Sequence, residues 1–80
     1  MRLDKFLKVS RLIKRRTVAN EACDGGRISV NGKPAKASYD VKVGDELEIH
    51  LGANPLRVRV EAVVEHVGKE GASELYRVLP

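Results

Sequence analysis

Several features that define other classes of protein are scarce in this chain of 80 residues. Its single cysteine, Cys23, excludes an internal disulfide framework and a zinc site made of several cysteines. No run of about 18 apolar residues is present, so no segment predicts a membrane-spanning helix. The first residues also lack the apolar core of a secretion signal. These absences favour a reduced, cytoplasmic compartment.

Residues suited to catalysis or to base stacking are also few. His50 and His66 have no Cys, Ser or carboxylate at the spacing of a catalytic motif, so we expect both on the surface. Cys23 lies in an apolar helical stripe and is predicted to be a core thiol. The chain has no Gly-rich phosphate loop. Its two tyrosines, Tyr39 and Tyr76, are isolated, which disfavours a platform for stacked single-stranded bases. The sequence therefore predicts no catalytic, metal or cofactor site.

The composition is that of one small folded domain. Apolar residues make up 42% of the chain, which is enough for a core and too much for a disordered protein. A domain of this size buries roughly 60% of the surface of its unfolded chain. That leaves room for one modest core and disfavours a deep catalytic pocket. We therefore expect residues 1–80 to form a single domain.

The charge is distributed unevenly along the chain, although the formal net charge is only +4. Residues 1–36 contain ten Lys or Arg and three Asp or Glu, a net charge of +7, whereas residues 37–80 contain five and eight, a net charge of −3. This asymmetry predicts a polyanionic partner on one side of the molecule. The alternative is a basic surface that binds nothing, as occurs on many small soluble proteins.

Two helices are predicted in the N-terminal half, over residues 2–9 and 15–24, with a short connection between them. Helical spacing places one set of apolar residues of each helix on an inner stripe. These residues are Leu3, Phe6 and Leu7 in the first helix, and Val18, Ala19, Ala22 and Cys23 in the second. Gly25-Gly26 is expected to end the second helix, because glycine adopts the left-handed conformation that closes helices.

The remainder is predicted to be rich in strands. Residues 27–30 alternate and precede Asn31-Gly32, a strong signal for a type I′ hairpin turn, while Pro34 limits the return arm over 33–37 to a short or edge strand. Alternation also predicts strands over 46–51 and 56–64, followed by a polar loop over 67–73 and a last strand over 75–79. Leu47, Ile49 and Leu51 would face inward, and the alternation places Leu56, Val58, Val60, Ala62 and Val64 on one side of the next strand. We expect an α+β fold with two helices packed on a small, mainly antiparallel sheet.

The run Lys14-Arg15-Arg16 opens the second predicted helix, where it opposes local stability. A helix N-terminus is already positive, which disfavours each cation there by roughly 0.3–1 kcal/mol. Ser, Thr, Asp or Asn would cap the helix better. Such a local conflict is often functional, and free backbone N–H groups beside three cations suit a phosphate. A solvated charge run between the helices is the alternative.

The other basic residues of this half extend the candidate site. One group lies on the polar side of the first helix and in the connection, and another lies on or near the hairpin. The predicted phosphate contacts are Arg2, Lys5, Lys8, Arg11, Lys14, Arg15, Arg16, Arg27, Lys33 and Lys36. Recognition of folded RNA through its shape and phosphates fits this pattern better than stacking of single strands.

Four segments in order resemble the S4 RNA-binding domain: RLDKFL (2–7), RTVA (16–19), GRISVNGK (26–33) and VGD (43–45). The resemblance implies an αL motif, made of two helices and a hairpin, over residues 1 to about 50, which binds structured RNA. It also implies C-terminal strands over about 46–79. Arg15 departs from the pattern, because many S4 domains have Ser or Thr there. This change weakens the helix cap and adds a charge.

The short length and the start MRLDKFLKVSRLIKRR are most similar to the free-standing bacterial S4 proteins of the RqcP (YabO) family. This resemblance implies a non-catalytic, ribosome-associated adaptor. Such an adaptor binds large ribosomal subunits obstructed by peptidyl-tRNA, contacts rRNA and tRNA, and supports an RqcH-like factor that adds C-terminal alanine tails to stalled chains. By position, Arg2 and Arg16 are the best contact candidates. We expect the protein to be monomeric.

Three alternatives remain at this point. A heat-shock-type S4 protein would recycle free large subunits that carry nascent chain-tRNA, although such proteins usually have a longer basic C-terminal tail. An RNA-modifying enzyme would require a catalytic domain beyond Pro80. A protein-interaction module would use an acidic strand face, which could coexist with RNA binding. The residues of that face are Glu46, Glu48, Glu61 and Glu65.

Overall fold

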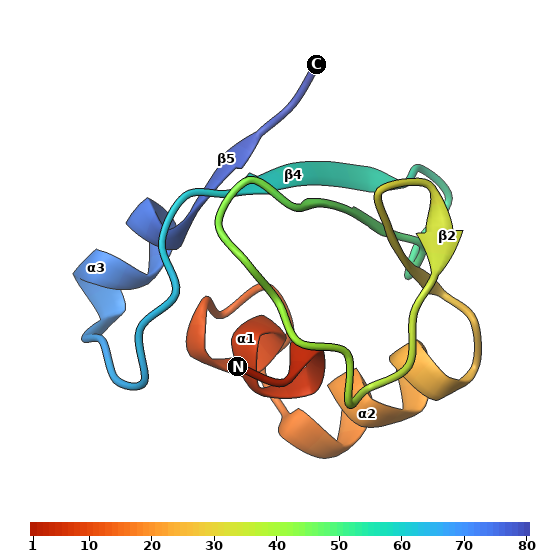
Figure 1. Ribbon diagram of the computed structural model, residues 1–80, viewed down its shortest axis with the longest axis horizontal. Coiled ribbons are helices and arrows are strands. Elements are labelled where there is room, and N and C mark those ends of the chain that lie inside the picture. Colours follow the sequence, from red (N-terminus) through yellow and green to blue (C-terminus); the bar gives the residue numbers. More distant parts are fainter.

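The computed structural model describes all 80 residues, which form three helices and a five-stranded antiparallel sheet (Figure 1). In chain order the elements are α1 (Leu3–Val9), α2 (Arg16–Asp24), β1 (Ile28–Val30), β2 (Lys33–Pro34), β3 (Glu46–Ile49), β4 (Leu56–Val60), α3 (Lys69–Ala72), the 3₁₀ turn η1 (Ser73–Leu75) and β5 (Tyr76–Val78). The strand order is β2-β1-β3-β4-β5. The predicted α+β fold is confirmed. None of the helices has the length and apolar character needed to cross a membrane.

One hydrophobic core lies between α1, α2 and the sheet. Phe6, Leu3 and Leu7 of α1 are fully buried against strand residues such as Leu47 and Val58. Burial of each such side chain contributes roughly 1.5–3 kcal/mol. This apolar contact fixes which face of α1 points to solvent, and so positions the polar residues on it.

Val18 is not part of this core, so its predicted place on the inner stripe was wrong. The buried stripe of α2 is made by Ala19, Ala22 and Cys23. At 100° per residue, Val18 lies at the margin of the arc that these three residues define. The residue is 43% exposed.

The β1–β2 hairpin has the predicted type I′ turn. Asn31 and Gly32 have φ values of 52° and 86°, and Val30 pairs with Lys33 across the turn. Positive φ at both central residues is what this turn requires. Pro34 ends the two-residue strand β2 at the edge of the sheet, which confirms the short edge strand.

The strands β3 and β4 are shorter than alternation predicts. Leu51 is 42% exposed, because it lies in the connection that follows Ile49, and Leu56, the first residue of β4, is 38% exposed. Val64, also 38% exposed, lies outside β4. Backbone N–H groups of residues 61 and 62 both donate to the carbonyl of Leu75, which breaks the regular ladder after Val60. The prediction that Leu51 faces inward was therefore wrong, and so was the extension of the next strand to Val64.

The polar loop expected over 67–73 is instead the short helix α3 followed by η1. Ala72 and Leu75 are buried, and Leu75 packs in the hydrophobic core. Gly71 lies so close to Val67 that a Cβ on it would clash with a methyl group of that side chain. The glycines of this segment predict a loop by composition, but the chain forms a turn of helix here.

The loop that follows β2 holds the start of α1 in place. The amides of Leu3 and Asp4 donate to the carbonyls of Tyr39 and Ala37, at 2.8 and 3.2 Å, and the amide of Val41 donates to the carbonyl of Met1 at 2.8 Å. These bonds satisfy two N–H groups that a helix start would otherwise leave unpaired. They also fix the backbone on both sides of Arg2.

Candidate nucleic-acid interface

A buried carboxylate, that of Asp4, joins the two helices at the basic surface. Its side chain is only 3% exposed and accepts hydrogen bonds on both oxygens. Arg2 Nε donates to Oδ1 at 3.1 Å, and Arg16 Nη2 reaches the same oxygen at 3.5 Å. Asn20 Nδ2 donates to Oδ2 at 3.1 Å, and the backbone amide of Lys5 donates to Oδ1 at 2.8 Å. One acidic group therefore organises donors from α1, α2 and the residue that precedes α1.

The pKa of Asp4 shows which effect dominates at this site. Burial by itself raises the pKa, because it disfavours the charged carboxylate. Hydrogen bonds from Arg2, Asn20 and Arg16, with the positive charge of Arg16, outweigh burial and lower the pKa to about 2. Asp4 is therefore ionised at neutral pH. The hydrogen bond to Asp4 and the negative charge of that carboxylate raise the pKa of Arg2 above its ordinary value.

Arg2 and Arg16 keep much of their guanidinium surface available to a ligand. Their side chains are 49% and 48% exposed, although each contacts Asp4. A guanidinium has five N–H donors, and Asp4 uses only some of them. The remaining donors form a planar fork that matches a phosphate, and Asp4 restricts how that fork can rotate.

Beside Arg16 lies a polar cleft of about 340 Å³ that contains no apolar side chain. It is lined by Asp4, Arg16, Thr17, Asn20 and Glu21. Such a lining suits phosphate and ribose hydroxyl groups rather than an apolar ligand. The cleft therefore extends the polar surface from Asp4 along α2.

The start of α2 has the conflict that the sequence predicts. Arg15 occupies the N-cap position with φ −114° and ψ 132°, and no side chain caps the helix. Its first turn contains no acidic residue. Lys14 and Arg15 are exposed and make no ion pair, whereas Arg16 is oriented by Asp4. Two cations thus remain unneutralised beside the oriented one.

The other predicted contacts fall into three groups. Lys8 and Arg11 are exposed without an ion pair, and Arg11 has a left-handed φ of 63° in the connection after α1. Lys5 differs, because its ammonium forms an ion pair with Glu65 and only 30% of its side chain is exposed. The last group is exposed; Lys33 lies on β2 and Lys36 in the loop after it, whereas Arg27 precedes β1 and lines a cleft with Val18 and Glu21 of α2. Its members are Arg27, Lys33 and Lys36.

Sequence reasoning missed Asp4 and Asn20 as members of the site. A signal was present for Asp4, since it lies three residues before Leu7 and so falls beside the buried stripe of α1. An acidic residue beside the buried stripe of a helix needs hydrogen-bond donors near its carboxylate, and a basic segment can provide them. Which donors these are depends on the packing of α2 against α1, and local patterns do not contain that information.

The strand half provides no free acidic surface over β3 and β4. Glu46 lies 3.2 Å from Arg59 and 3.8 Å from Arg57, which also approaches Glu48 at 3.7 Å. This side of the sheet is a ladder of opposite charges rather than the uniformly acidic face expected for binding a protein partner.

Cys23 is buried in α2. Burial, followed by the charges of Asp4 and Asp24, raises the pKa of its thiol to about 11. The predicted core thiol is confirmed.

A family model of the S4 domain matches residues 1–47, which include α1, α2 and the hairpin. The chain belongs to the S4 domain family. It is 57% identical over 79 residues to a Bacillus subtilis protein named RQC P-site tRNA stabilizing factor, covering 99% of this chain and 92% of that one. A protein of the same name from Halalkalibacterium halodurans is 62% identical over 78 residues, covering 98% and 89%. The predicted S4 membership, with similarity to quality-control proteins, is confirmed.

Among solved structures, heat shock protein 15 of Vibrio cholerae has the same fold, with a TM-score of 0.92. It is 31% identical to this chain, and the similarity covers 99% of this chain and 81% of that one. That structure is described as trimeric. The S4 arrangement thus extends beyond the family-model match, over the C-terminal strands as well.

Proposed function

We propose that this protein is a non-catalytic RNA-binding adaptor of bacterial ribosome-associated quality control. It binds the large ribosomal subunit obstructed by peptidyl-tRNA, contacts both rRNA and tRNA, and supports an RqcH-like factor that adds alanine tails to the stalled chain. It acts in the cytoplasm on the ribosome, as a monomer in which residues 1–80 form one domain. The names of the two bacterial relatives, which refer to a P-site tRNA, support this role.

The observation that carries the proposal is the Asp4 cluster. Arg2 lies at the start of α1 and Arg16 at the start of α2, yet both contact one buried carboxylate. Two oriented guanidinium groups from different elements can grip two phosphates that are close in space but belong to different RNA strands. Such a contact would suit a factor that holds tRNA against rRNA. Exposed Lys8, Arg11, Lys14 and Arg15 add phosphate contacts around it.

Co-sedimentation with large subunits that carry peptidyl-tRNA tests the proposal. We expect the wild-type protein to sediment with them, and Arg2→Ala and Arg16→Ala to lose this binding. Arg77→Ala is the matched control, because Arg77 is an exposed arginine on β5 without an ion pair. Circular dichroism checks that each variant is folded. Retained binding in both Arg2→Ala and Arg16→Ala would contradict the site.

A heat-shock-type role, the recycling of free large subunits that carry nascent chain-tRNA, is the second candidate. The close similarity of fold to heat shock protein 15 favours it. The relatives that share the quality-control name are 57% and 62% identical, against 31% for that protein, which favours the first role. A tailing reaction reconstituted with an RqcH-like factor separates the two. We expect longer alanine tails when this protein is added, whereas the recycling role predicts no change in tail length.

A further inference from the structure

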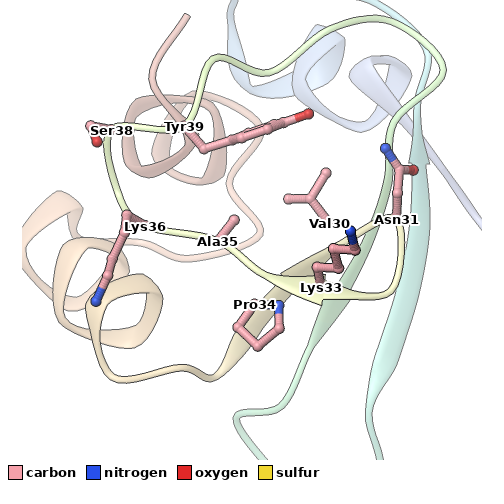
Figure 2. A pocket seen from close by; sticks show the side chains of 8 residues that line it. All are labelled: Val30, Asn31, Lys33, Pro34, Ala35, Lys36, Ser38 and Tyr39. Carbon is pink, nitrogen blue, oxygen red and sulfur yellow. The ribbon is translucent and has the colours of Figure 1, made fainter.

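A second cleft lies on the hairpin side of the molecule and shares no residue with the cleft beside Asp4. It has a volume of about 630 Å³, within the range of roughly 300–1,000 Å³ that is usual for small-ligand sites. Its walls are the β1–β2 hairpin and the loop that follows it (Figure 2). The lining residues are Val30, Asn31, Lys33, Pro34, Ala35, Lys36, Ser38 and Tyr39.

Asp45 ties the two walls of this cleft together. Tyr39 Oη donates to its Oδ2 at 2.9 Å, and Asn31 Nδ2 donates to its Oδ1 at 3.1 Å. The amide of Lys42 also donates to Oδ2, at 3.0 Å, and Asn31 Oδ1 accepts the amide of Glu46 at 3.0 Å. The aromatic ring and the turn are therefore held in place without a ligand.

The Tyr39 ring is the largest flat group of the cleft. In Figure 2 it extends from the loop toward the strand that carries Val30, with its hydroxyl group pointing toward the hairpin side. Val30, Pro34 and Ala35 add apolar surface. Burial, followed by the hydrogen bond to Asp45 and the charge of that carboxylate, raises the pKa of Tyr39, which keeps the phenol neutral. The cleft thus combines a fixed aromatic ring with an apolar floor.

Two cations border this apolar slot, and neither of them is in an ion pair. Lys33 lies on the hairpin, beside Asn31, whereas the side chain of Lys36 points away from Tyr39 in Figure 2. A flat apolar slot with an ammonium group at its rim matches a nucleobase attached to a phosphate. An acidic peptide would use the lysines but would leave the ring and floor without a complementary group.

We propose that this cleft binds one unstacked nucleotide, with its base on the Tyr39 ring and its phosphate on Lys33. The proposal rests on the proposed RNA-binding function and adds a contact to a flipped-out base. A single aromatic ring can stack on one base but cannot hold the successive bases of a single strand. This agrees with the scarcity of aromatic residues in the chain. Lys36 is available for the phosphate of the next nucleotide.

Titration of the ¹⁵N-labelled protein with AMP, monitored by amide chemical shifts, tests the cleft directly. Adenosine and inorganic phosphate are titrated separately. We expect saturable shifts at Asn31, Lys33 and Tyr39 with AMP, and weaker binding of adenosine. Inorganic phosphate that reproduces the AMP shifts at equal concentrations would overturn the proposal, because it would show attraction of anions by lysines only. Tighter binding of an oligoglutamate peptide at the same residues would also overturn it.

Substitutions separate the ring from its hydrogen bond. Tyr39→Leu is expected to weaken AMP binding about tenfold, since base–aromatic stacking contributes about 1–3 kcal/mol per base. Tyr39→Phe keeps the ring, loses the bond to Asp45 and should bind AMP nearly as well as the wild type. Lys33→Ala should weaken AMP binding and leave adenosine binding unchanged. Unchanged AMP affinity in Tyr39→Leu would overturn the proposal.

The two proposals fail in different ways. Arg2→Ala should lose large-subunit binding but keep the AMP shifts at the cleft, because Arg2 does not line it. Absence of AMP shifts in a wild-type protein that still sediments with large subunits would overturn the cleft alone. Failure of the wild-type protein to sediment with large subunits would overturn the proposed function, and the AMP titration would still decide the cleft.

Discussion

Arg2 and Arg16 donate to the same oxygen atom, Oδ1 of Asp4, at 3.1 and 3.5 Å. One arginine precedes α1 and the other begins α2, so the shared oxygen couples the starts of the two helices. Because Asp4 is buried and ionised, it opposes the mutual repulsion of the two guanidinium groups. The pair is therefore oriented before RNA binds, which reduces the entropy lost on association.

The first prediction concerns Asp4→Asn, which preserves the shape of the side chain but removes its charge. Two arginines then face a neutral amide, and the hydrogen bonds to a charged acceptor are lost. We expect the free energy of unfolding to fall by roughly 1–3 kcal/mol, seen as a lower urea midpoint with an unchanged slope. Binding to large subunits should also weaken, because Arg2 and Arg16 lose their common anchor.

Asp40→Asn is the control for this prediction. Asp40 also forms an ion pair, with the N-terminal amine at 2.7 Å, but its side chain is 69% exposed. An exposed pair contributes little to stability, so its loss should change the urea midpoint much less. If Asp4→Asn retains both the stability and the large-subunit affinity of the wild type, Asp4 does not organise the site.

The second prediction concerns acid stability. The folded-state pKa of Asp4 is about 2, below its ordinary value of 3.8. A carboxyl group whose pKa is lowered in the folded state stabilises the native protein at pH values above its unfolded-state pKa. This contribution is lost as the pH falls through the folded-state pKa. Asp4 should therefore make its full contribution to the free energy of unfolding, roughly 2 kcal/mol, above pH about 4. This contribution should disappear as the pH falls from about 4 to about 2.

Urea unfolding at a series of pH values measures this effect. Other carboxylates with lowered pKa values, among them Asp45, lose stability in the same direction. The contribution of Asp4 is therefore the difference between the wild type and Asp4→Asn, which should shrink as the pH falls from about 4 to 2. A constant difference over that interval would show that Asp4 does not titrate in this way.

The N-terminal half was predictable from local patterns. Asn31-Gly32 specifies its own turn because both residues tolerate positive φ, and the apolar stripe of α1 defines the buried face without reference to the rest of the chain. The basic character of the surface around Arg16 could also be predicted, because a cation at a helix start conflicts with the helix dipole.

The strand boundaries and the pairing of charges depend on contacts that are distant in sequence. Alternation continues past Val60, but β4 ends there because the next two amides both bind the carbonyl of Leu75. Lys5 pairs with Glu65, so it leaves the group of unpaired cations on α1. Asp4 is a site residue only because the packing of α2 brings Asn20 and Arg16 next to it. These facts follow from tertiary structure and not from any window of sequence.

The third prediction concerns the hairpin turn. Gly32 has a φ of 86°, which is strained for a residue with a Cβ, although no atom lies within 4 Å of the Cβ position. Gly32→Ala should therefore lower the free energy of unfolding by about 1 kcal/mol through backbone strain alone. Gly52→Ala is the matched control, since Gly52 has equal space and no positive φ. Equal urea midpoints for the two variants would contradict this account of the turn.

The fourth prediction concerns salt. If the surface around Asp4 neutralises about six phosphates, the affinity for large subunits should fall with a log–log slope of about −4 to −5 against monovalent salt at fixed Mg²⁺. Arg16→Ala should make this slope shallower by about 1, provided that residual binding is measured at low salt. Arg77→Ala should leave the slope unchanged. A flat response in the wild type would rule out a phosphate clamp, because binding through hydrogen bonds or apolar contacts alone releases no counterions.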